Sequence, residues 1–257
     1  MQMQIDFEEL ANELHLVHTT RLALRPLALS DAWPLWEATR NPAFNAGLLW
    51  EQPTQVSQVF ERVEAILRAA QRGRLAAVSA VVKETGQWVG LFRLQPHASS
   101  PAAIELGIWM HPAFWHGRFS LEFAKGCANA AFSLSDAQLL VGAAAPANRG
   151  ACHLNRLGGL VPVRTVWRKH ETLADVELIE HEITREQWLA QRAQDARGGR
   201  KVFEQVMLPG RQGAAGRMAM VTPLPAPQPV QPVQPAVPAA LQPNPAGEAL
   251  IELRQAA

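Results

Sequence analysis

The sequence predicts a mixed α/β fold, in which a mostly antiparallel central sheet is flanked by helices and followed by a disordered tail. Short apolar runs alternate with segments of helical periodicity between residues 14 and 195. The composition changes near residue 196, beyond which proline-rich stretches such as "VTPLPAPQPVQPVQPAVPAALQPNP" carry neither pattern. We therefore expect a lead segment over 1–13, one folded domain over 14–195 and a disordered tail over 196–257.

The folded part begins with a strand and a helix. The segment "TTRLALRPL" alternates so that Leu22 and Leu24 share one face, which is typical of a half-buried strand. Ser30 and Asp31 follow, and both residue types favour the N-cap of a helix. We expect them to cap a helix over "AWPLWEATR".

A second helix and a three-stranded meander come next. Apolar residues at helical spacing predict a helix over 55–72 that ends at Gly73. These residues are Val56, Val59, Val63, Ile66 and Leu67. The runs "LAAVSAVV" and "QWVGLFRL", joined by "KETG", predict a β-hairpin. The run "AIELGIWM" adds a third strand, which stops before Pro112.

The last part of the domain alternates between helices and strands. A helix is predicted over 120–134, a strand over "AQLLVGAAA" and a short helix over "NRGACHLNRL". The runs "GGLVPVRTVWRK" and "DVELIEHEI" predict a closing antiparallel pair. The segment "TREQWLAQRAQD" predicts a final helix, because Thr184 and Gln187 have the spacing of a capping box.

Composition and cysteine usage bound the function. The formal net charge of +1, with scattered basic residues, argues against a nucleic-acid or membrane-surface partner. Cys127 and Cys152 lack the spacing of a metal site or a redox motif. The start "MQMQIDFEEL" does not resemble a signal peptide, and no run of eighteen uncharged apolar residues occurs. We expect a cytoplasmic protein without a metal.

One stretch has the layout of an anion site. "HPAFWHGRFSLE" joins the strand "IELGIWM" to the helix that follows it. The first amides of a helix, with the positive end of its dipole, favour phosphate. Gly117 permits a close approach of the backbone, Arg118 supplies a cation and Ser120 is placed as an N-cap. A plain connector is the alternative interpretation of the same residues.

Four pieces of the chain together resemble the GNAT superfamily of N-acetyltransferases. They are "TTRLALRPLALSDAWPLWEATRNP", "IELGIWMHPAFWHGRFSLEFA", "NRGACHLNRLGGLVPV" and "TREQWL", and they cover most of residues 17–190. The chain is most similar to the branch that contains the ribosomal-protein N-terminal acetyltransferases. The resemblance implies a sheet splayed between "ELGIWM" and "LLVGAA", with acetyl-coenzyme A as acyl donor in the split.

The resemblance also implies which residues bind this donor. Its pantetheine arm would pair with backbone at Met110 and His111, and its pyrophosphate would meet the amides of the following turn. The turn residues are His116, Gly117, Arg118, Phe119 and Ser120. The turn is degenerate, because the family places two glycines around a basic residue here. If residue 118 needs a glycine-only conformation, Arg118 impairs binding; if it is helical, Arg118 strengthens it.

Glu105 and Asn148 are the catalytic candidates. Glu105 matches an acid that is common at this place in the branch, so we expect a general base, with an exposed strand-end glutamate as the alternative. Asn148 matches the family asparagine that contacts the cofactor or a water, and as a bare asparagine it is simply an N-cap. The family's neighbouring serine is Ala151 here, and the chain has no tyrosine to protonate the leaving thiolate. Cys152 is interpreted as a structural thiol.

The function that these residues favour is transfer of an acetyl group from acetyl-coenzyme A to a primary amine, on a small molecule or a protein N-terminus. The alternative is a catalytically impaired GNAT-fold binding module that uses the proline-rich tail as a ligand for a protein partner. His111 and His116 flank the turn, but no third ligand accompanies them, so no metal is expected. A monomer and a homodimer are both open.

Overall fold

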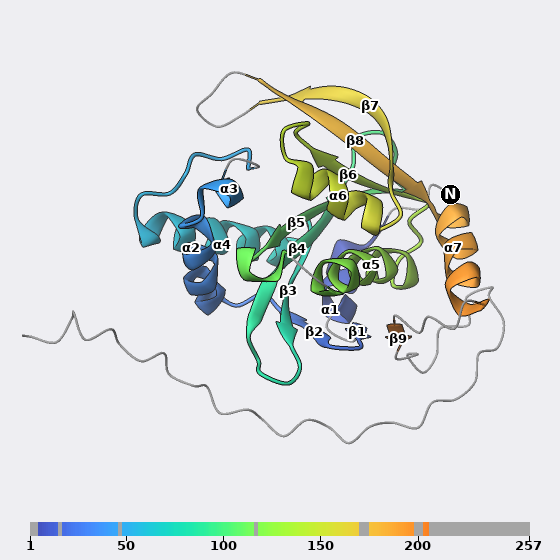
Figure 1. The fold of residues 1–257 in the computed structure, drawn as a ribbon, viewed down its shortest axis with the longest axis horizontal. Helices are drawn as coiled ribbons and strands as arrows, with labels where there is room; N and C mark the ends of the chain where they lie inside the picture. Colours follow the sequence, from blue (N-terminus) through green and yellow to red (C-terminus); the bar gives the residue numbers. More distant parts are fainter. Residues whose placement is uncertain are drawn as a thin grey trace, which may run out of the picture. The chain divides into compact units, whose positions relative to one another are not determined.

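A nine-stranded sheet forms the centre of the described residues, in the order β7-β8-β6-β5-β4-β3-β2-β1-β9 (Figure 1). The computed structural model describes residues 5–14, 17–45, 48–115, 118–169, 175–197 and 203–205. The strands are β1 (Val17–Thr19), β2 (Leu22–Pro26), β3 (Ala76–Val82), β4 (Trp88–Pro96), β5 (Ala103–Met110), β6 (Leu139–Ala144), β7 (Val161–Arg168), β8 (Val176–Thr184) and β9 (Phe203–Gln205). The predicted mixed sheet flanked by helices is confirmed.

Helices cover both faces of the sheet. They are α1 (Phe7–Leu14), α2 (Ala32–Thr39), α3 (Pro42–Asn45), α4 (Val56–Gln71), α5 (Arg118–Ser133), α6 (Arg149–Leu157) and α7 (Arg185–Arg197). In Figure 1, α2, α3 and α4 lie together on one side, and α1, α5 and α7 on the other. No helix among the described residues is long and apolar enough to cross a membrane.

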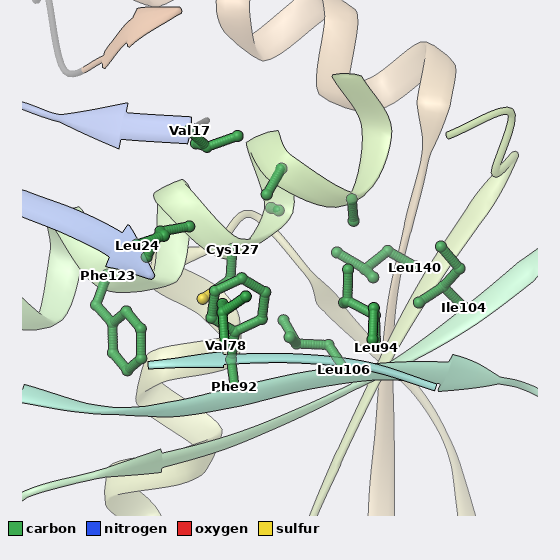
Figure 2. Packing of buried hydrophobic residues seen from close by; sticks show 14 of the residues in the cluster. Val17, Leu24, Val78, Phe92, Leu94, Ile104, Leu106, Phe123, Cys127 and Leu140 are labelled. Carbon is green, nitrogen blue, oxygen red and sulfur yellow. The ribbon is translucent and has the colours of Figure 1, made fainter. Parts of the chain in front are cut away.

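Two hydrophobic cores correspond to these two layers. The larger core packs α1 and α5 against the sheet, with Phe92 and Phe123 buried in its middle. Figure 2 shows Cys127 of α5 beside Val78 and Phe92 of the strands, with Phe123 to their left. The smaller core packs α2, α3 and α4 on the other face, around residues such as Val63. Strand residues alternate between the two cores, as a sheet covered on both faces requires.

The sheet opens between β5 and β6. These two strands are parallel, and their pairing runs only from Ala103 opposite Leu139 to Leu106 opposite Gly142. The rest of β5, from Gly107 to Met110, pairs with β4 alone. One edge of β5 therefore loses its partner halfway along the strand, as the predicted splay requires.

The β3–β4 hairpin has the predicted glycine turn and an unpredicted bulge. Gly86 in the turn has a φ of 68°, a conformation that glycine adopts without strain. Ala80 pairs with Gly90, whereas Val81 pairs with Trp88, so Val89 is the extra residue of a bulge. Beside this bulge, Gly90 lies against Met110, the last residue of β5 and the end of its unpaired half.

Gly90→Ala is expected to lower the free energy of unfolding by about 2 kcal/mol, because overpacking a filled position costs about 1–3 kcal/mol. A methyl group there would collide with the Trp109 carbonyl oxygen and lie 3.1 Å from Met110 Cα. Urea denaturation measures the change. Gly86→Ala is the control. Its added methyl group would meet no atom within 4 Å, so its loss of stability measures only the cost of the positive φ. Equal, small losses in both variants would contradict the tight approach of β4 and β5.

Asp31 does not cap α2 as the sequence predicts. The side chain makes no hydrogen bond to the first turn of that helix. Its carboxylate instead accepts hydrogen bonds from Arg25 Nη1 at 2.8 Å and Nη2 at 2.5 Å, and from Ser79 Oγ at 2.7 Å. Asp31 is almost fully buried, and a buried carboxylate is tolerated when it has such partners. It therefore ties the α2 layer to β2 and β3.

The ends of the domain differ in how well the sequence predicts them. At α7, Gln187 N donates to Thr184 Oγ1 at 3.2 Å and Thr184 N donates to Gln187 Oε1 at 2.9 Å, which confirms the capping box. At the other end, α1 lies within the segment interpreted only as a lead. Its Phe7 and Leu10 are buried in the larger core, so this helix packs with the rest of the folded part.

Candidate active site

The unpaired half of β5 presents backbone groups to the opening of the sheet. His111 N donates to Val89 O of β4 at 2.8 Å. Backbone groups of successive strand residues point to opposite edges, so those of Ile108 and Met110 face away from β4. Trp115 Nε1 donates to Met110 O at 2.8 Å, which places the indole beside this edge. Met110 and His111 are the two residues whose backbone is predicted to pair with a pantetheine arm. The backbone of Met110 faces the opening, whereas the amide of His111 already donates to Val89 O.

The helix α5 begins where this edge ends. Its first residue is Arg118, so the backbone of residue 118 is helical and glycine is not required there. Ser120 does not act as the predicted N-cap, because it lies inside the helix. Its hydroxyl donates to Trp115 O at 2.8 Å and to Phe114 O at 3.1 Å. His116 and Gly117 lie outside the described residues.

The start of α5 is held against the β1–β2 turn by a buried carboxylate. Glu122 accepts hydrogen bonds from Arg21 N at 2.5 Å, Arg21 Nε at 2.7 Å and Leu22 N at 3.1 Å, and from Thr19 Oγ1. Burial alone would raise the pKa of Glu122, but the hydrogen bonds from Thr19 and Arg21 and the charge of Arg21 lower it. The Arg21 guanidinium also lies 4.1 Å from the ring centroid of Phe119. The first turn of α5 is thus fixed from two sides.

Glu105 lies on the other face of β5, in a cluster of charged residues. Its carboxylate forms an ion pair with Arg168 of β7. The Arg168 guanidinium also contacts Glu180 Oε1 of β8 at 3.2 Å. Burial alone would lower the pKa of Arg168. The hydrogen bonds and charges of Glu105 and Glu180 raise it by more, so the pKa lies above its ordinary value. The side chain of Glu105 is 15% exposed. It is therefore neither the strand-end glutamate in water nor a carboxyl in an apolar pocket.

Glu180 is the centre of this cluster, and the sequence did not single it out. It accepts from Arg164 Nη2 at 2.5 Å and is 3.3 Å from His97 Nε2. Burial raises the pKa of Glu180, but the contacts with His97, Arg164 and Arg168 lower it overall. In the β7–β8 register Arg164 lies directly opposite Glu180, and this pairing of opposite charges is the signal that could have identified the cross-strand network.

Asn148 occupies the N-cap of α6. Its side-chain Oδ1 accepts from Ala151 N at 3.0 Å. The cap role expected of a bare asparagine is therefore present, with the residue close to the end of β6. Cys152, on the same helix, is buried, and its Sγ lies 3.6 Å from Ala145 O. Burial raises the pKa of the Cys152 thiol, so it is uncharged at neutral pH.

His111 does not belong to a metal site among the described residues, and His116 lies outside them. No group of three or more histidine, cysteine, aspartate or glutamate side chains is placed to hold a metal in the described ranges. His111 Nδ1 accepts from Ala113 N at 3.2 Å, and burial lowers the pKa of its imidazole. His111 therefore stays neutral at pH 7 and stabilises the turn that follows β5.

Solved structures share this fold at low sequence identity. A GNAT-family acetyltransferase from Bacillus anthracis has a TM-score of 0.57 at 13% identity, covering 66% of this chain and 98% of its own. Spermidine N-acetyltransferase from Vibrio cholerae, in complex with CoA and spermine, has a TM-score of 0.56 at 15% identity, covering 66% and 99%. The Salmonella typhimurium acetyltransferase that modifies the N-terminal serine of ribosomal protein L7/L12 has a TM-score of 0.55 at 15% identity, covering 64% and 95%.

Sequence comparison identifies the family directly. None of the curated protein sequences matches this chain. The family profile of the acetyltransferase (GNAT) domain, however, matches residues 21–159, which include β2, the opened β5–β6 pair and α6. Because this match spans more than half of the 257 residues, the chain belongs to the GNAT acetyltransferase family.

Proposed function

We propose that this protein transfers the acetyl group of acetyl-coenzyme A to a primary amine. The observation that carries the proposal is the opening between β5 and β6, where Ile108 and the Met110 amide have no strand partner on the β6 side. A free strand edge can pair with the amides of a pantetheine arm. A helix start can hold a pyrophosphate. The chain therefore offers both elements that the donor needs.

In this proposal the donor is bound mainly by backbone groups. Pantetheine pairs with Ile108 and Met110, and the pyrophosphate meets the amides of the turn and of α5, from His116 to Ser120. The helical backbone of Arg118 supports this assignment, since no glycine-only conformation is needed there. Asn148 holds the start of α6 in place at the far side of the opening.

The reaction needs an orienting site and a proton acceptor. The neutral amine attacks the thioester carbonyl, the C–S bond breaks, and coenzyme A leaves as a thiolate. We propose that Glu105, directly or through a water, takes the proton that the amine loses. The chain has no tyrosine, so the thiolate takes its proton from Cys152, from Ser120 or from water, or it leaves unprotonated.

The acceptor and the branch of the family are part of the proposal. Two of the structural relatives above act on spermidine or on a ribosomal-protein N-terminus, and we propose an acceptor amine on a small molecule or a protein N-terminus. The resemblance to the ribosomal-protein acetyltransferases favours the second kind. The two cysteines are free and buried in the described part of the chain, which fits a cytoplasmic setting.

A second candidate is a GNAT-fold binding module with impaired turnover. Two observations favour it: Trp115 Nε1 already occupies the Met110 carbonyl, and Glu105 is ion-paired with Arg168. A partner of the proline-rich tail would then carry the function. Of the segment 196–257 that the sequence predicts as a disordered tail, the structure describes 196–197 as the end of α7 and 203–205 as β9, which pairs with β1. The proline-rich stretch lies outside the described residues.

Isothermal titration with acetyl-coenzyme A is expected to show binding in the micromolar range, and mass spectrometry should detect N-acetylated product with an amine panel that includes spermidine and a serine-starting peptide. Binding without any product would favour the second candidate. Absence of binding at millimolar acetyl-coenzyme A would contradict both the proposed activity and the donor site.

A further inference from the structure

Two glycines lie at the closed end of the opening, where β5 and β6 separate, and a polar side chain covers each of them. Gly142 forms the last residue pair of the two strands with Leu106, and Gly107 is the first residue of β5 beyond that pair. An added methyl group at Gly142 would sit 2.6 Å from Asn155 Oδ1. One at Gly107 would sit 2.9 Å from Arg93 Nε. Both side chains therefore use the space that a larger residue would fill.

Asn155 and Arg93 lie on opposite faces of the sheet. Successive residues of a strand point to opposite faces, so Gly107 shares its face with Glu105. Leu106 points the other way, into the larger core that α5 covers. Gly142 is paired with Leu106 and shares its face. Asn155 therefore covers the closed end of the opening on the face away from Glu105.

The helix α6 brings Asn155 to this place. It begins after Asn148, beyond the end of β6, and runs back over that strand. Along the way Cys152 Sγ lies 3.6 Å from Ala145 O, and one turn later the Asn155 amide lies over Gly142. The Asn155 side chain is half-buried, so one side of the amide remains accessible.

A buried histidine lies behind the Asn155 amide. His181 of β8 pairs with Gly142 and is fully buried. Its Nδ1 is 3.3 Å from Asn155 Nδ2 and 3.1 Å from Ile179 O, and its Nε2 has no hydrogen-bond partner in the described part of the chain. Burial, and then the charge of Arg156, lower the pKa of His181, whereas the backbone of Ile179 and of Gly142 raises it by less. The imidazole is therefore neutral at pH 7, and its Nδ1 can accept a hydrogen bond from Asn155.

The donor, as placed under the proposed function on which this step rests, brings its sulfur to the same point. Its pyrophosphate lies at the start of α5, beyond Met110. The pantetheine arm then runs back along β5 past Ile108, so the thioester reaches the closed end of the opening. Glu105, the proposed proton acceptor, lies there on the other face of β5. The reacting atoms therefore fall between Glu105 on one face and Asn155 on the other.

We infer that the Asn155 amide donates a hydrogen bond to the sulfur of coenzyme A as it leaves, and that His181 positions this amide. An amide nitrogen carries two N–H groups, so one remains for the sulfur when His181 accepts the other. When the C–S bond breaks, its electron pair goes to the sulfur, and the proton that the amine loses goes to its own acceptor. The sulfur of a thioester carries little charge, so the contact strengthens as the thiolate forms. An asparagine amide does not give up a proton, so coenzyme A leaves as the thiolate and is protonated afterwards.

The pKa of the coenzyme A thiol, measured in its complex with the protein, tests this contact without acetyl transfer. Thiolates absorb in the ultraviolet, and the chain has no tyrosine whose ionisation would interfere. Desulfo-coenzyme A, which lacks the thiol, gives the background of the two cysteines. The bound thiol is expected to have a pKa about one unit below that of free coenzyme A, the scale of one hydrogen bond to a charged group.

Substitutions of Asn155 should move this thiol pKa in a set order. Asn155→Leu removes both N–H groups and should return the pKa to about the value of free coenzyme A. Asn155→Asp keeps the shape and brings a negative charge to the sulfur, so it should raise the pKa above the free value. His153→Gln, at an exposed position of the same helix, is the control and should keep the shift of the parent protein.

His181 and Gly142 test the positioning of the amide. His181→Leu should lose about half of the shift of the thiol pKa, and His181→Gln, which keeps an acceptor, should restore it. Gly142→Ala leaves Asn155 and His181 unchanged but displaces the amide, so it should also reduce the shift. In steady-state kinetics Asn155→Leu should lower kcat about tenfold, while the Kd of acetyl-coenzyme A changes less than twofold.

Two results would overturn the inference: a bound thiol with the same pKa as free coenzyme A, or an equal shift in the parent protein and in Asn155→Leu. Calorimetry separates these results from a failure of the proposed function. If coenzyme A does not bind, the donor site itself is wrong, and the role of Asn155 falls with it. If coenzyme A binds and its thiol is not shifted, only the role of Asn155 fails, and the proposed acetyl transfer stands.

Discussion

Glu122→Gln is expected to lower the free energy of unfolding by about 3 kcal/mol, because breaking a buried, hydrogen-bonded ion pair typically costs about 3–5 kcal/mol. The carboxylate is 6% exposed and accepts from two backbone amides, a hydroxyl and the Arg21 guanidinium. An amide at this position presents its own N–H donors to some of those donors. The partial exposure of Arg21 keeps the expected loss at the low end of the range.

The pH dependence of stability offers a second test of Glu122. Its pKa is lower in the folded protein than in the unfolded chain. The stabilisation is therefore complete above the unfolded pKa, near 4.3, and is lost as the pH falls through the lower, folded value. Urea denaturation at neutral and acidic pH should show a smaller acid-induced loss in Glu122→Gln than in the parent protein.

Glu64→Gln is the matched control for Glu122→Gln. Glu64 pairs with Arg68 at 3.1 Å on the surface of α4, and both side chains are about half exposed. Such exposed pairs contribute about 0.3–0.5 kcal/mol, so the control should change stability very little. If Glu122→Gln and Glu64→Gln each lower the free energy of unfolding by less than about 1 kcal/mol, the carboxylate of Glu122 does not hold α5 to the β1–β2 turn.

The elements that the sequence predicted well are those whose signals are local. Val59 and Val63 lie one turn apart and predict α4, and both are fully buried in the structure. Thr184 and Gln187 predict the start of α7 for the same reason. The helix α1 also had such a signal, because Asp6 Oδ1 accepts from Glu8 N at 2.9 Å and Glu9 N at 3.0 Å. The helix was not predicted because acidic residues surround Phe7 and Leu10, so the apolar face that these two residues form is short.

The environment of the candidate site was not predictable, because its contacts join distant parts of the chain. Glu122 meets residues about 100 positions away, and Glu105 meets Arg168, 63 positions away. Periodicity indicates which face a side chain occupies, but not which charges lie opposite it on another strand. The family resemblance predicted Glu105 and the turn before α5 as site residues. It did not predict Arg93, Arg168 or Glu180.

Glu105→Gln is expected to reduce kcat by about 100-fold, at the low end of the range for removal of a general base. The ion pair with Arg168 fixes the position of the Glu105 carboxylate and engages one of its two oxygens. We expect the modest end of the range because this oxygen is already engaged. The affinity for acetyl-coenzyme A should change less than twofold, since the proposed donor contacts lie on the backbone of Ile108 and Met110.

The alternative role for Glu105 is to anchor Arg168 and the β7–β8 hairpin, and two variants separate the roles. Arg168→Met removes the anchor and keeps the carboxylate, so it should lower kcat far less than Glu105→Gln if the carboxylate takes the proton. Glu182→Gln changes another carboxylate of the cluster, 3.1 Å from Arg164, and should leave kcat within about twofold. Steady-state kinetics with a fixed amine measures all three variants. Equal losses in Arg168→Met and Glu105→Gln would assign Glu105 to positioning, because only a proton acceptor requires the carboxylate itself rather than its pairing.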